Sequence, residues 1–370
     1  MKLLIFIHSL SSGGAERVTT NLANYWAEKG WNITVVTMTA RSTDFYELHP
    51  AVERIALELA GDSGNVLTGL RQNLRRVTAL RRTLRQIRPD IALAMMSTAN
   101  VLLALAAWGL PKLRAIGSER IHPPQLRLST RWEGLRRYTY GRLDAVTALT
   151  RETADWLKDH TGARRVPVIP NAAAWPLAAQ APRLITEMIG VADRSIVLAV
   201  GRLDKQKGFD WLIEAFAALA PKYRDWDLLI LGEGAERRAL ENQVQAAGLG
   251  RRVFLPGRAG NIGEWYERVD LYVMSSRFEG FPNTLAEAMA HGLPVVSFDC
   301  DTGPRDIIRH EVDGLLVPPG DLVAMKSALE RLMGDSALRT KFASRALEAR
   351  ERFSMERISG MWEELFAELR

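Results

Sequence analysis

Short apolar runs alternate along the chain with longer segments whose apolar residues recur every three or four positions. The runs predict strands at 2–8, 32–38, 52–57, 91–96, 113–117, 144–148 and 166–169, and then at 195–200, 227–231, 252–255, 270–274, 294–298 and 314–317. The longer segments predict helices at 15–29, 66–88, 101–108, 129–141 and 150–160, and then at 209–220, 235–247, 261–267, 284–291, 305–309, 321–333, 336–352 and 354–369. This alternation indicates an α/β protein with parallel sheets covered by helices on both faces.

The segment 173–193 separates the two series and contains Pro176 and Pro182 but no strand pattern. It therefore predicts a linker between an N-terminal domain at 1–172 and a C-terminal domain at 194–353, with a last helix at 354–370. At 370 residues the chain exceeds the size at which one core usually stops growing. Two doubly wound domains would bind ligands at the carboxyl ends of their strands.

Two apolar stretches raise the question of membrane insertion. The first, 1–8, is too short for a signal peptide and predicts a buried strand. The second, 91–111, carries no charge, but residues 97–100 interrupt it and Asn100 is a favourable helix cap. We therefore expect a strand and a helix here, and only peripheral contact with a membrane. The single cysteine, Cys300, excludes an intrachain disulfide and fits a reducing compartment.

Positive charge is concentrated in one part of the chain. Residues 61–142 hold 15 Lys and Arg against four Asp and Glu, a net charge of +11. The whole chain has a net charge of +6, so the remaining residues together carry −5. This distribution excludes a protein that coats nucleic acid through a uniformly basic surface, but it is compatible with one basic docking face. In the predicted helix 66–88, an apolar stripe from Val66 to Ile87 lies beside seven arginines. The stripe is expected to face the core, and the arginines to face solvent or an anionic partner.

The turn after the first strand contains Gly13 and Gly14. Paired glycines let the backbone approach a ligand, and the helix that follows favours an anion. A turn selected only for tight packing explains the pair equally well. The third glycine of a dinucleotide fingerprint is missing, which argues against a nicotinamide oxidoreductase.

The second domain opens with a similar turn at 201–208, which carries Arg202 and Lys207 after a strand. Two cations at this edge of a sheet suit a departing diphosphate, because negative charge grows on it as its bond breaks. The alternative is a solvated basic loop.

The segment 279–289 holds two carboxylates in different settings. Asn283 predicts a helix cap, so Glu287 lies inside the helix and Glu279 outside it. The two could bind opposite ends of one elongated ligand with hydroxyl-rich ends, with a phosphate near the backbone N–H groups of residues 283–285. Their placement does not suit the acid pair of a glycosidase. The alternative is that Glu279 is an ordinary surface residue and that Glu287 only interacts favourably with the helix dipole.

These motifs together resemble the retaining glycosyltransferases of family four. The resemblance rests on Gly13–Arg17, Ile169–Asn171, Gly201–Gly208, Glu279-x7-Glu287 and Asp313–Val317, which follow the family's order over almost the whole chain. It implies the GT-B fold, in which two Rossmann-like domains face a central cleft and the last helix, here expected at 354–370, crosses back to the N-terminal domain. It also implies a nucleotide sugar as donor, here expected to be a UDP-sugar, and neither a metal nor another cofactor.

The resemblance further implies roles for individual residues. Arg202, Lys207 and Glu279 would be catalytic, with the two cations on the donor diphosphate and Glu279 on the sugar hydroxyls. Glu287 would bind the donor ribose, and the loop with Arg258 would flank the base. Donor binding would further involve Gly14, Phe281, Asn283, Thr284 and Leu285.

One stretch departs from the common family pattern. Many members carry a histidine just after the strand that matches 113–117, whereas this chain has Ser118-Glu119-Arg120 and a displaced His122. Some members that build surface polysaccharides show the same Ser-Glu-Arg. Gly13, Glu119, Arg120 and His122 are therefore candidates for the acceptor side, with His122 expected to be a partly exposed loop residue.

The resemblance thus implies a bacterial enzyme that moves a hexose or N-acetylhexosamine, with retention, to a polyprenyl-diphosphate-linked glycan at the cytoplasmic face of the membrane. Anionic lipid or the acceptor diphosphate would meet the basic helix through Arg71, Arg75, Arg76 and Arg82. An epimerase or phosphorylase of the same fold is the alternative. A nucleic-acid-binding protein is a more distant one, since no recognised motif supports it, and no nucleic-acid partner is expected.

Overall fold

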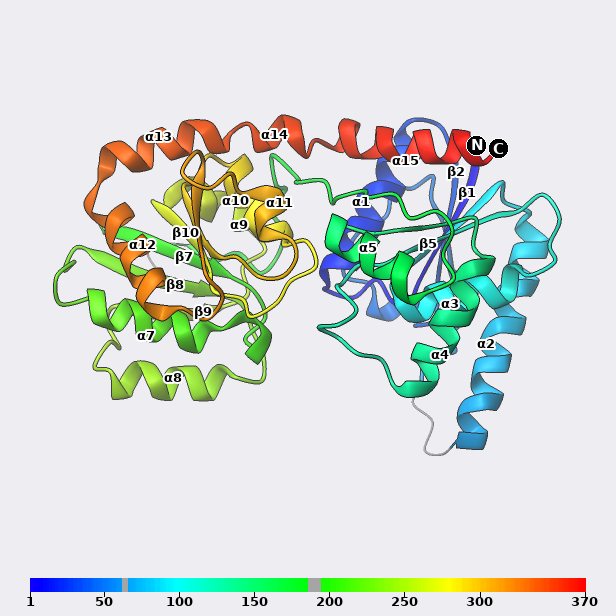
Figure 1. Ribbon diagram of the computed structural model, residues 1–370, viewed down its shortest axis with the longest axis horizontal. Helices are drawn as coiled ribbons and strands as arrows, with labels where there is room; N and C mark the ends of the chain where they lie inside the picture. The colour runs from blue at the N-terminus through cyan, green and yellow to red at the C-terminus, as the bar shows by residue number, and fades with distance from the viewer. Residues whose placement is uncertain (62–65, 186–193) are drawn as a thin grey trace. The chain divides into compact units, whose positions relative to one another are not determined.

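The computed structural model describes residues 1–61, 66–185 and 194–370 of the chain. These form two compact units, one made of 1–172 with 355–370 and the other of 173–354. Figure 1 shows that each unit contains a central sheet flanked by helices. The prediction of two Rossmann-like α/β domains is thereby confirmed.

Unit 1 is built on a six-stranded parallel sheet of order β3-β2-β1-β4-β5-β6. Its strands are β1 (Lys2–Ile7), β2 (Asn32–Thr37), β3 (Glu53–Ala56), β4 (Ile91–Met95), β5 (Arg114–Ser118) and β6 (Ala145–Thr147). Its helices are α1 (Gly14–Glu28), α2 (Val66–Ile87), α3 (Ser97–Ala107), α4 (Thr130–Thr139), α5 (Arg151–His160) and the C-terminal α15 (Met355–Leu369).

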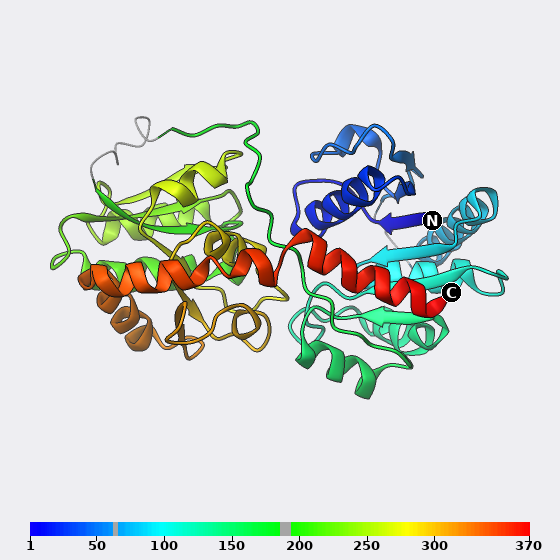
Figure 2. The ribbon, with the colours of Figure 1, turned by 90° about the horizontal axis from the view of Figure 1, so that it is seen from above.

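Alternate residues of β1 enter two different cores. Leu3 and Ile5 pack with α1 and α15, whereas Leu4 and Phe6 pack with residues of α2 and α3. A strand that is buried on both faces needs apolar residues at every position, which explains its unbroken apolar run. Helix α15, red in Figure 2, completes the first of these cores and contacts α1.

Unit 2 repeats the architecture with a parallel sheet of order β12-β11-β10-β7-β8-β9. Its strands are β7 (Ser195–Val200), β8 (Trp226–Leu231), β9 (Val253–Gly257), β10 (Leu271–Met274), β11 (Val295–Phe298) and β12 (Gly314–Val317). Its helices are α7 (Phe209–Leu219), α8 (Arg237–Ala246), α9 (Ile262–Arg268), α10 (Asn283–Ala290), α11 (Pro304–Ile307), α12 (Leu322–Gly334), α13 (Ser336–Ala346) and α14 (Ala349–Arg352).

Three predicted elements were wrong in detail. Residues 166–169 form only an isolated bridge, between Ala148 and Val168, because no longer strand pairs there. The segment 336–352 is two helices, α13 and α14, rather than one. Helix α3 begins at Ser97, so Asn100 lies inside it and is not its cap.

Asn100 is completely buried, and its side chain is used in tertiary contacts. It accepts a hydrogen bond from the Ser118 N–H at 3.0 Å and donates to the Tyr140 hydroxyl at 3.1 Å. A capping propensity read from the sequence could not reveal these partners, because both lie on other elements.

The described part of the predicted linker contacts unit 2. Gln180 N–H donates to Gly260 at 3.0 Å, and Leu184 N–H donates to the Asn261 side chain at 3.0 Å. Residues 180–184 therefore lie on the β9–α9 loop of unit 2, while 186–193 fall outside the described residues.

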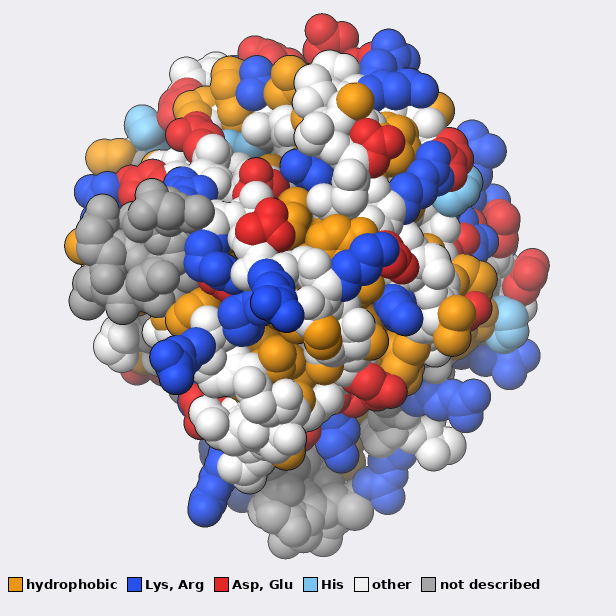
Figure 3. All heavy atoms as spheres, turned by 90° about the vertical axis from the view of Figure 1, so that its left-hand side faces the viewer, with side chains coloured by type: hydrophobic (Ala, Val, Ile, Leu, Met, Phe, Trp, Pro, Cys, Tyr) orange, Lys and Arg blue, Asp and Glu red, His pale blue; other side chains and the backbone are white. Residues whose placement is uncertain are grey.

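No helix in the described part of the chain is both long and apolar enough to cross a bilayer. The run 91–111 folds as β4 and α3, as the sequence predicts. On the face that Figure 3 shows, basic and acidic side chains are interspersed.

Candidate active site

The strand order of each sheet reverses at one point, where loops leave the sheet in opposite directions and open a space for ligands. In unit 2 this point lies between β7 and β10. The loop after β7 carries Arg202 and Lys207, and the loop after β10 carries Glu279. Lys207 and Glu279 are 72 positions apart in sequence but are neighbours in space, because β7 and β10 are adjacent strands.

Lys207 and Glu279 form the centre of the site in unit 2. The Lys207 Nζ lies 2.6 Å from the Glu279 Oε1, and the Ser276 hydroxyl donates to the same oxygen at 2.6 Å. The Lys207 and Glu279 side chains are only 17% and 8% exposed. A partly desolvated ammonium and carboxylate placed side by side can bind an anion and a hydroxyl group of one ligand.

Glu287 lies one turn inside α10 and is almost completely buried. Burial raises the pKa of the nearby Tyr272 phenol, and the Glu279 and Glu287 carboxylates raise it further. Both carboxylates therefore act on one buried phenol, which itself donates to the Thr284 hydroxyl at 2.8 Å. Sequence reasoning missed Tyr272 and Ser276, because neither belongs to a charged motif.

The start of α10 differs from the prediction. Pro282 occupies the cap position and Asn283 is the first helical residue, with no side-chain cap. The Leu285 N–H donates to the Pro282 carbonyl at 3.1 Å and is not available for a phosphate. The predicted role of Asn283 as a cap was wrong, because Pro282 supplies the extended residue that precedes the helix.

Three other predicted donor residues differ in exposure. The Arg202 side chain is 72% exposed and lies 3.2 Å from Asp204. Arg258 is exposed on the loop after β9. Phe281 is buried and packs edge-on against Phe353 at 5.4 Å, so its ring belongs to the core.

Arg277 connects the two loops of the site. Its guanidinium binds both carboxylate oxygens of Asp210, at 2.9 and 2.7 Å, and donates to the Lys205 carbonyl at 2.6 Å. It also lies 3.7 Å above the ring of Trp211. The Arg277 N–H donates to the Gln206 carbonyl at 2.7 Å, so both ends of the residue hold the segment that precedes Lys207.

Gly208 allows the same two loops to touch. Its φ of +62° is left-handed, and a Cβ there would lie 2.1 Å from the Ser275 carbonyl oxygen. Only glycine fits this position without moving the backbone. The Ser275 hydroxyl in turn donates to the Lys207 carbonyl at 2.9 Å, which fixes the loop from the other side.

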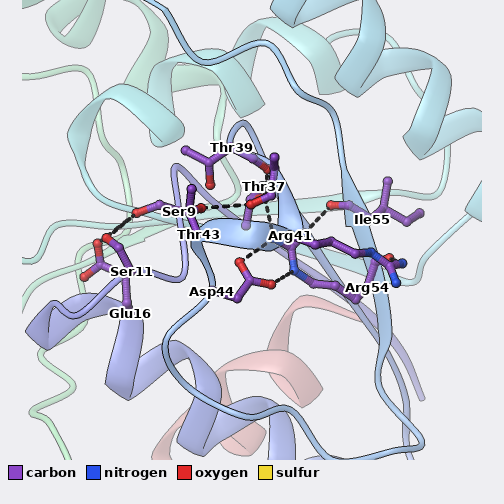
Figure 4. A network of polar contacts seen from close by, with 11 residues as sticks. Ser9, Ser11, Glu16, Thr37, Thr39, Arg41, Thr43, Asp44, Arg54 and Ile55 are labelled. Atoms are coloured by element: carbon purple, nitrogen blue, oxygen red, sulfur yellow. Dashed lines mark hydrogen bonds and ion pairs between the residues drawn. The ribbon is translucent and has the colours of Figure 1, made fainter.

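In unit 1 the glycine turn follows β1, next to the reversal point between β1 and β4. Gly13 is the cap residue of α1 and Gly14 its first residue. The Ser9 hydroxyl contacts the Ser11 hydroxyl at 3.0 Å and donates to Glu16 at 3.2 Å (Figure 4). The Glu16 carboxylate folds over Gly13, where a Cβ would lie 2.0 Å from its Oε2.

Glu119 has no exposed surface and points into unit 1. Tyr140 donates to its Oε2 at 2.6 Å, and Ser97 donates to its Oε1. Burial raises the pKa of this carboxyl above its ordinary value, while the two hydrogen bonds oppose the rise. Glu119 joins the end of β5 to α3 and to the end of α4, so its contacts are structural.

His122 is buried, and its Nδ1 lies 3.1 Å from the Thr153 hydroxyl. The expectation of a partly exposed loop histidine was wrong, because helix α5 supplies a partner and covers the ring. The neighbouring Arg120 is also buried, and donates to Asn171 of the Ile169–Asn171 motif.

The basic helix α2 is only partly covered. Leu80 and Leu84 are buried as predicted, but Leu70 and Leu74 are 70% and 66% exposed. The prediction that the whole apolar stripe faces the core was therefore wrong, because the first turns of α2 extend beyond α3 and α4 (Figure 1). The side chains of Val66 and Leu67 lie outside the described residues.

The four arginines predicted to meet an anionic partner are not equivalent. Arg71, Arg75 and Arg82 are exposed, whereas Arg76 donates to the carbonyls of Leu59 at 3.0 Å and Gly61 at 2.7 Å. Arg76 therefore supports the preceding loop.

Comparisons with known proteins agree with this architecture. Residues 12–173 match the family described as Glycosyltransferase Family 4, and residues 194–335 match Glycosyl transferases group 1. An exopolysaccharide phosphotransferase of Streptomyces coelicolor is 37% identical over 294 residues, which are 78% of this chain and 30% of that protein. The chain thus spans about a third of that relative.

Two further similarities cover whole chains. A Campylobacter jejuni protein is 27% identical over 371 residues, covering 100% of this chain and 99% of its own. Its name is GalNAc-alpha-(1->4)-GalNAc-alpha-(1->3)-diNAcBac-PP-undecaprenol alpha-1,4-N-acetyl-D-galactosaminyltransferase. The crystal structure of Anabaena HepE in complex with UDP superimposes with a TM-score of 0.81 at 21% identity, over 100% of both chains. With its two six-stranded parallel sheets and these family matches, the chain is a glycosyltransferase of family 4 with the GT-B fold.

Proposed function

We propose that this enzyme transfers a hexose or N-acetylhexosamine from a UDP-sugar to a polyprenyl-diphosphate-linked glycan in bacterial surface-polysaccharide synthesis. The observation that carries the proposal is the Lys207–Glu279 pair at the reversal point of the unit 2 sheet, with Glu287 buried nearby. The name of the Campylobacter jejuni relative, which includes an undecaprenol-linked glycan, and the UDP complex of HepE support the choice of substrates.

In the proposed reaction the acceptor hydroxyl attacks the anomeric carbon from the face that the diphosphate leaves. The new carbon–oxygen bond forms as the bond to the diphosphate breaks, so the configuration is retained. The proton of the hydroxyl passes to a diphosphate oxygen, and UDP leaves. The Lys207 ammonium and the Arg202 guanidinium stabilise the growing charge without a metal, while Glu279 holds sugar hydroxyls and Glu287 holds the ribose.

The test is release of UDP from a panel of UDP-sugars, with and without a lipid-linked oligosaccharide. We expect release to rise strongly when acceptor is present, and the anomeric coupling constant of the product to match that of the donor. An epimerase would convert the sugar nucleotide without releasing UDP. A phosphorylase would need inorganic phosphate and would form a sugar 1-phosphate. Either result, or an inverted product, would contradict the proposal.

We further propose that the first turns of α2 meet phosphate groups of anionic lipid or of the acceptor diphosphate, at the cytoplasmic face of the membrane. Exposed leucines between exposed arginines form a surface that is both apolar and basic. Such a surface gains from burying apolar area among headgroups and from attraction to anionic lipid.

Vesicle binding tests this surface directly. The variant Leu70→Ser/Leu74→Ser/Arg71→Gln/Arg75→Gln should bind vesicles containing phosphatidylglycerol at least tenfold more weakly than the natural protein. Arg224→Gln/Arg251→Gln, which changes two exposed arginines of unit 2, is the matched control and should bind normally. Equal binding to neutral and anionic vesicles would reject the lipid role, and unchanged use of a short water-soluble diphosphate acceptor would reject the acceptor role.

Arg277 is expected to act on donor binding through Lys207. Arg277→Met should weaken UDP binding about tenfold, because the guanidinium no longer holds Asp210 and the Lys205 carbonyl on either side of Lys207. In a Lys207→Met background the same change should have almost no further effect. Isothermal titration of the four variants of this cycle measures the coupling.

Arg339→Met is the control for the Arg277 cycle, since Arg339 also lies over a tryptophan ring, that of Trp226, and donates to a carbonyl. It should leave UDP affinity unchanged. Additive effects of Arg277→Met and Lys207→Met would show that Arg277 does not act through Lys207.

A further inference from the structure

Arg120 is a buried cation whose hydrogen bonding is incomplete. It follows β5, and the residue is only 8% exposed. Its guanidinium donates to Asn171 and, over a long 3.4 Å, to the Ser118 hydroxyl. Its Nε is buried and has no hydrogen-bond partner. Both partners are neutral, so neither compensates the charge.

Within the described residues, two other arginines are equally buried, and both have a carboxylate partner. Arg54 lies 2.9 Å from Asp44 in the network of Figure 4, and Arg136 pairs with Glu133. Among the residues that the structure describes, Arg120 forms no such ion pair. The carboxylate of the adjacent Glu119 accepts hydrogen bonds from Ser97 and Tyr140 instead. Burial lowers the pKa of Arg120 to about 9, with no opposing effect of an acid.

A desolvated guanidinium without a counter-ion is costly, and a structure retains one where an anion completes it. The planar fork of arginine matches the oxygens of a phosphate group. Arg120 stands at the carboxyl end of the unit 1 sheet, the edge at which doubly wound sheets bind their ligands. An incoming oxyanion would replace the weak contact with Ser118 and supply the missing negative charge.

We propose that Arg120 binds a phosphoryl oxygen of a substrate, separately from Lys207 in unit 2. This inference rests on the proposed function, in which two substrates carry a diphosphate: the donor nucleotide and the lipid-linked acceptor. The chemistry is the same in both, so two probes are needed to tell the sources apart.

The test titrates UDP and geranyl diphosphate into the natural protein, Arg120→Gln and Arg120→Lys. Arg120→Gln should weaken one probe 10- to 100-fold and leave the other within twofold, and the affected probe identifies the source. Arg120→Lys should retain part of that affinity, since it keeps the charge. Affinities for both probes within twofold of the natural protein would overturn the proposal.

Asn171→Ala distinguishes the charge of Arg120 from its structural hydrogen bond to Asn171, because the variant loses that hydrogen bond and keeps the guanidinium. It should bind both probes within about threefold of the natural protein. If Asn171→Ala and Arg120→Gln weaken binding equally, Arg120 only ties Asn171 to β5, and the proposal fails.

Chemical labelling tests the proposal on the natural protein, so the result does not depend on whether a variant folds. Phenylglyoxal modification of Arg120, followed by mass spectrometry, should slow at least fivefold when the bound probe is present, while the exposed Arg164 is modified at an unchanged rate. Unchanged labelling of Arg120 at saturating probe contradicts the proposal. A natural protein that binds neither probe contradicts the proposed function instead, so the two failures are distinguishable.

Discussion

Lys207→Met is expected to lower kcat about 100- to 1000-fold, the usual effect of removing one donor that stabilises transition-state charge. The ammonium is partly desolvated and lies 2.6 Å from Glu279, so its interaction with a departing diphosphate is screened little by water. Methionine keeps most of the unbranched side chain but is one atom shorter, and it removes the ammonium with its charge and its hydrogen bonds. Steady-state release of UDP measures the effect.

Lys205→Met is the matched control for this loss. Lys205 lies two residues away in the same loop, and its side chain is exposed. Its kcat should stay within twofold of the natural value. Arg202→Ala is expected to lose activity as well, as the second cation of the loop. Natural turnover in Lys207→Met would remove Lys207 from the mechanism.

Trp362→Ala is expected to reduce the free energy of unfolding by about 3–5 kcal/mol, the range for a large aromatic side chain deleted from a core. Trp362 of α15 is 1% exposed and packs in the core that α1 and β1 share. The change leaves a cavity where the last helix packs against α1. Urea unfolding followed by circular dichroism measures the loss.

Trp108→Ala is the comparison for this loss, since Trp108 is 62% exposed and contacts only the Arg142 guanidinium at 3.9 Å among the ring contacts of the described residues. Its cost should be about 1 kcal/mol or less. Equal midpoints for Trp362→Ala and the natural protein would mean that α15 contributes little to unit 1.

The candidate site was predictable in part. Lys207 and Glu279 each belong to a local motif, and the position of both after apolar strands indicates the ligand edge of a sheet. Their contact was not predictable, because it depends on β7 and β10 being neighbours. Arg277 and Tyr272 were missed for the same reason, since their roles come from partners on other loops.

The Ser118–Arg120 segment shows the limit more sharply. Glu119 and Arg120 are adjacent charged residues, and the sequence treats them alike as candidates for the acceptor side. The structure gives Glu119 two donors inside unit 1 and leaves the Arg120 Nε without an acceptor. The two residues differ only because the fold places Ser97 and Tyr140 beside Glu119 and Asn171 beside Arg120.

The sequence by itself determined the two α/β domains, because uninterrupted apolar strands that alternate with amphipathic helices can be buried only in parallel sheets covered on both faces. It also located the +11 segment 61–142 and the family motifs. The tertiary structure decided which part of that basic segment is exposed, since Leu70 and Leu74 extend past their neighbours while Leu80 and Leu84 do not. Periodicity defines the apolar face of a helix, but burial depends on whether another element lies against it.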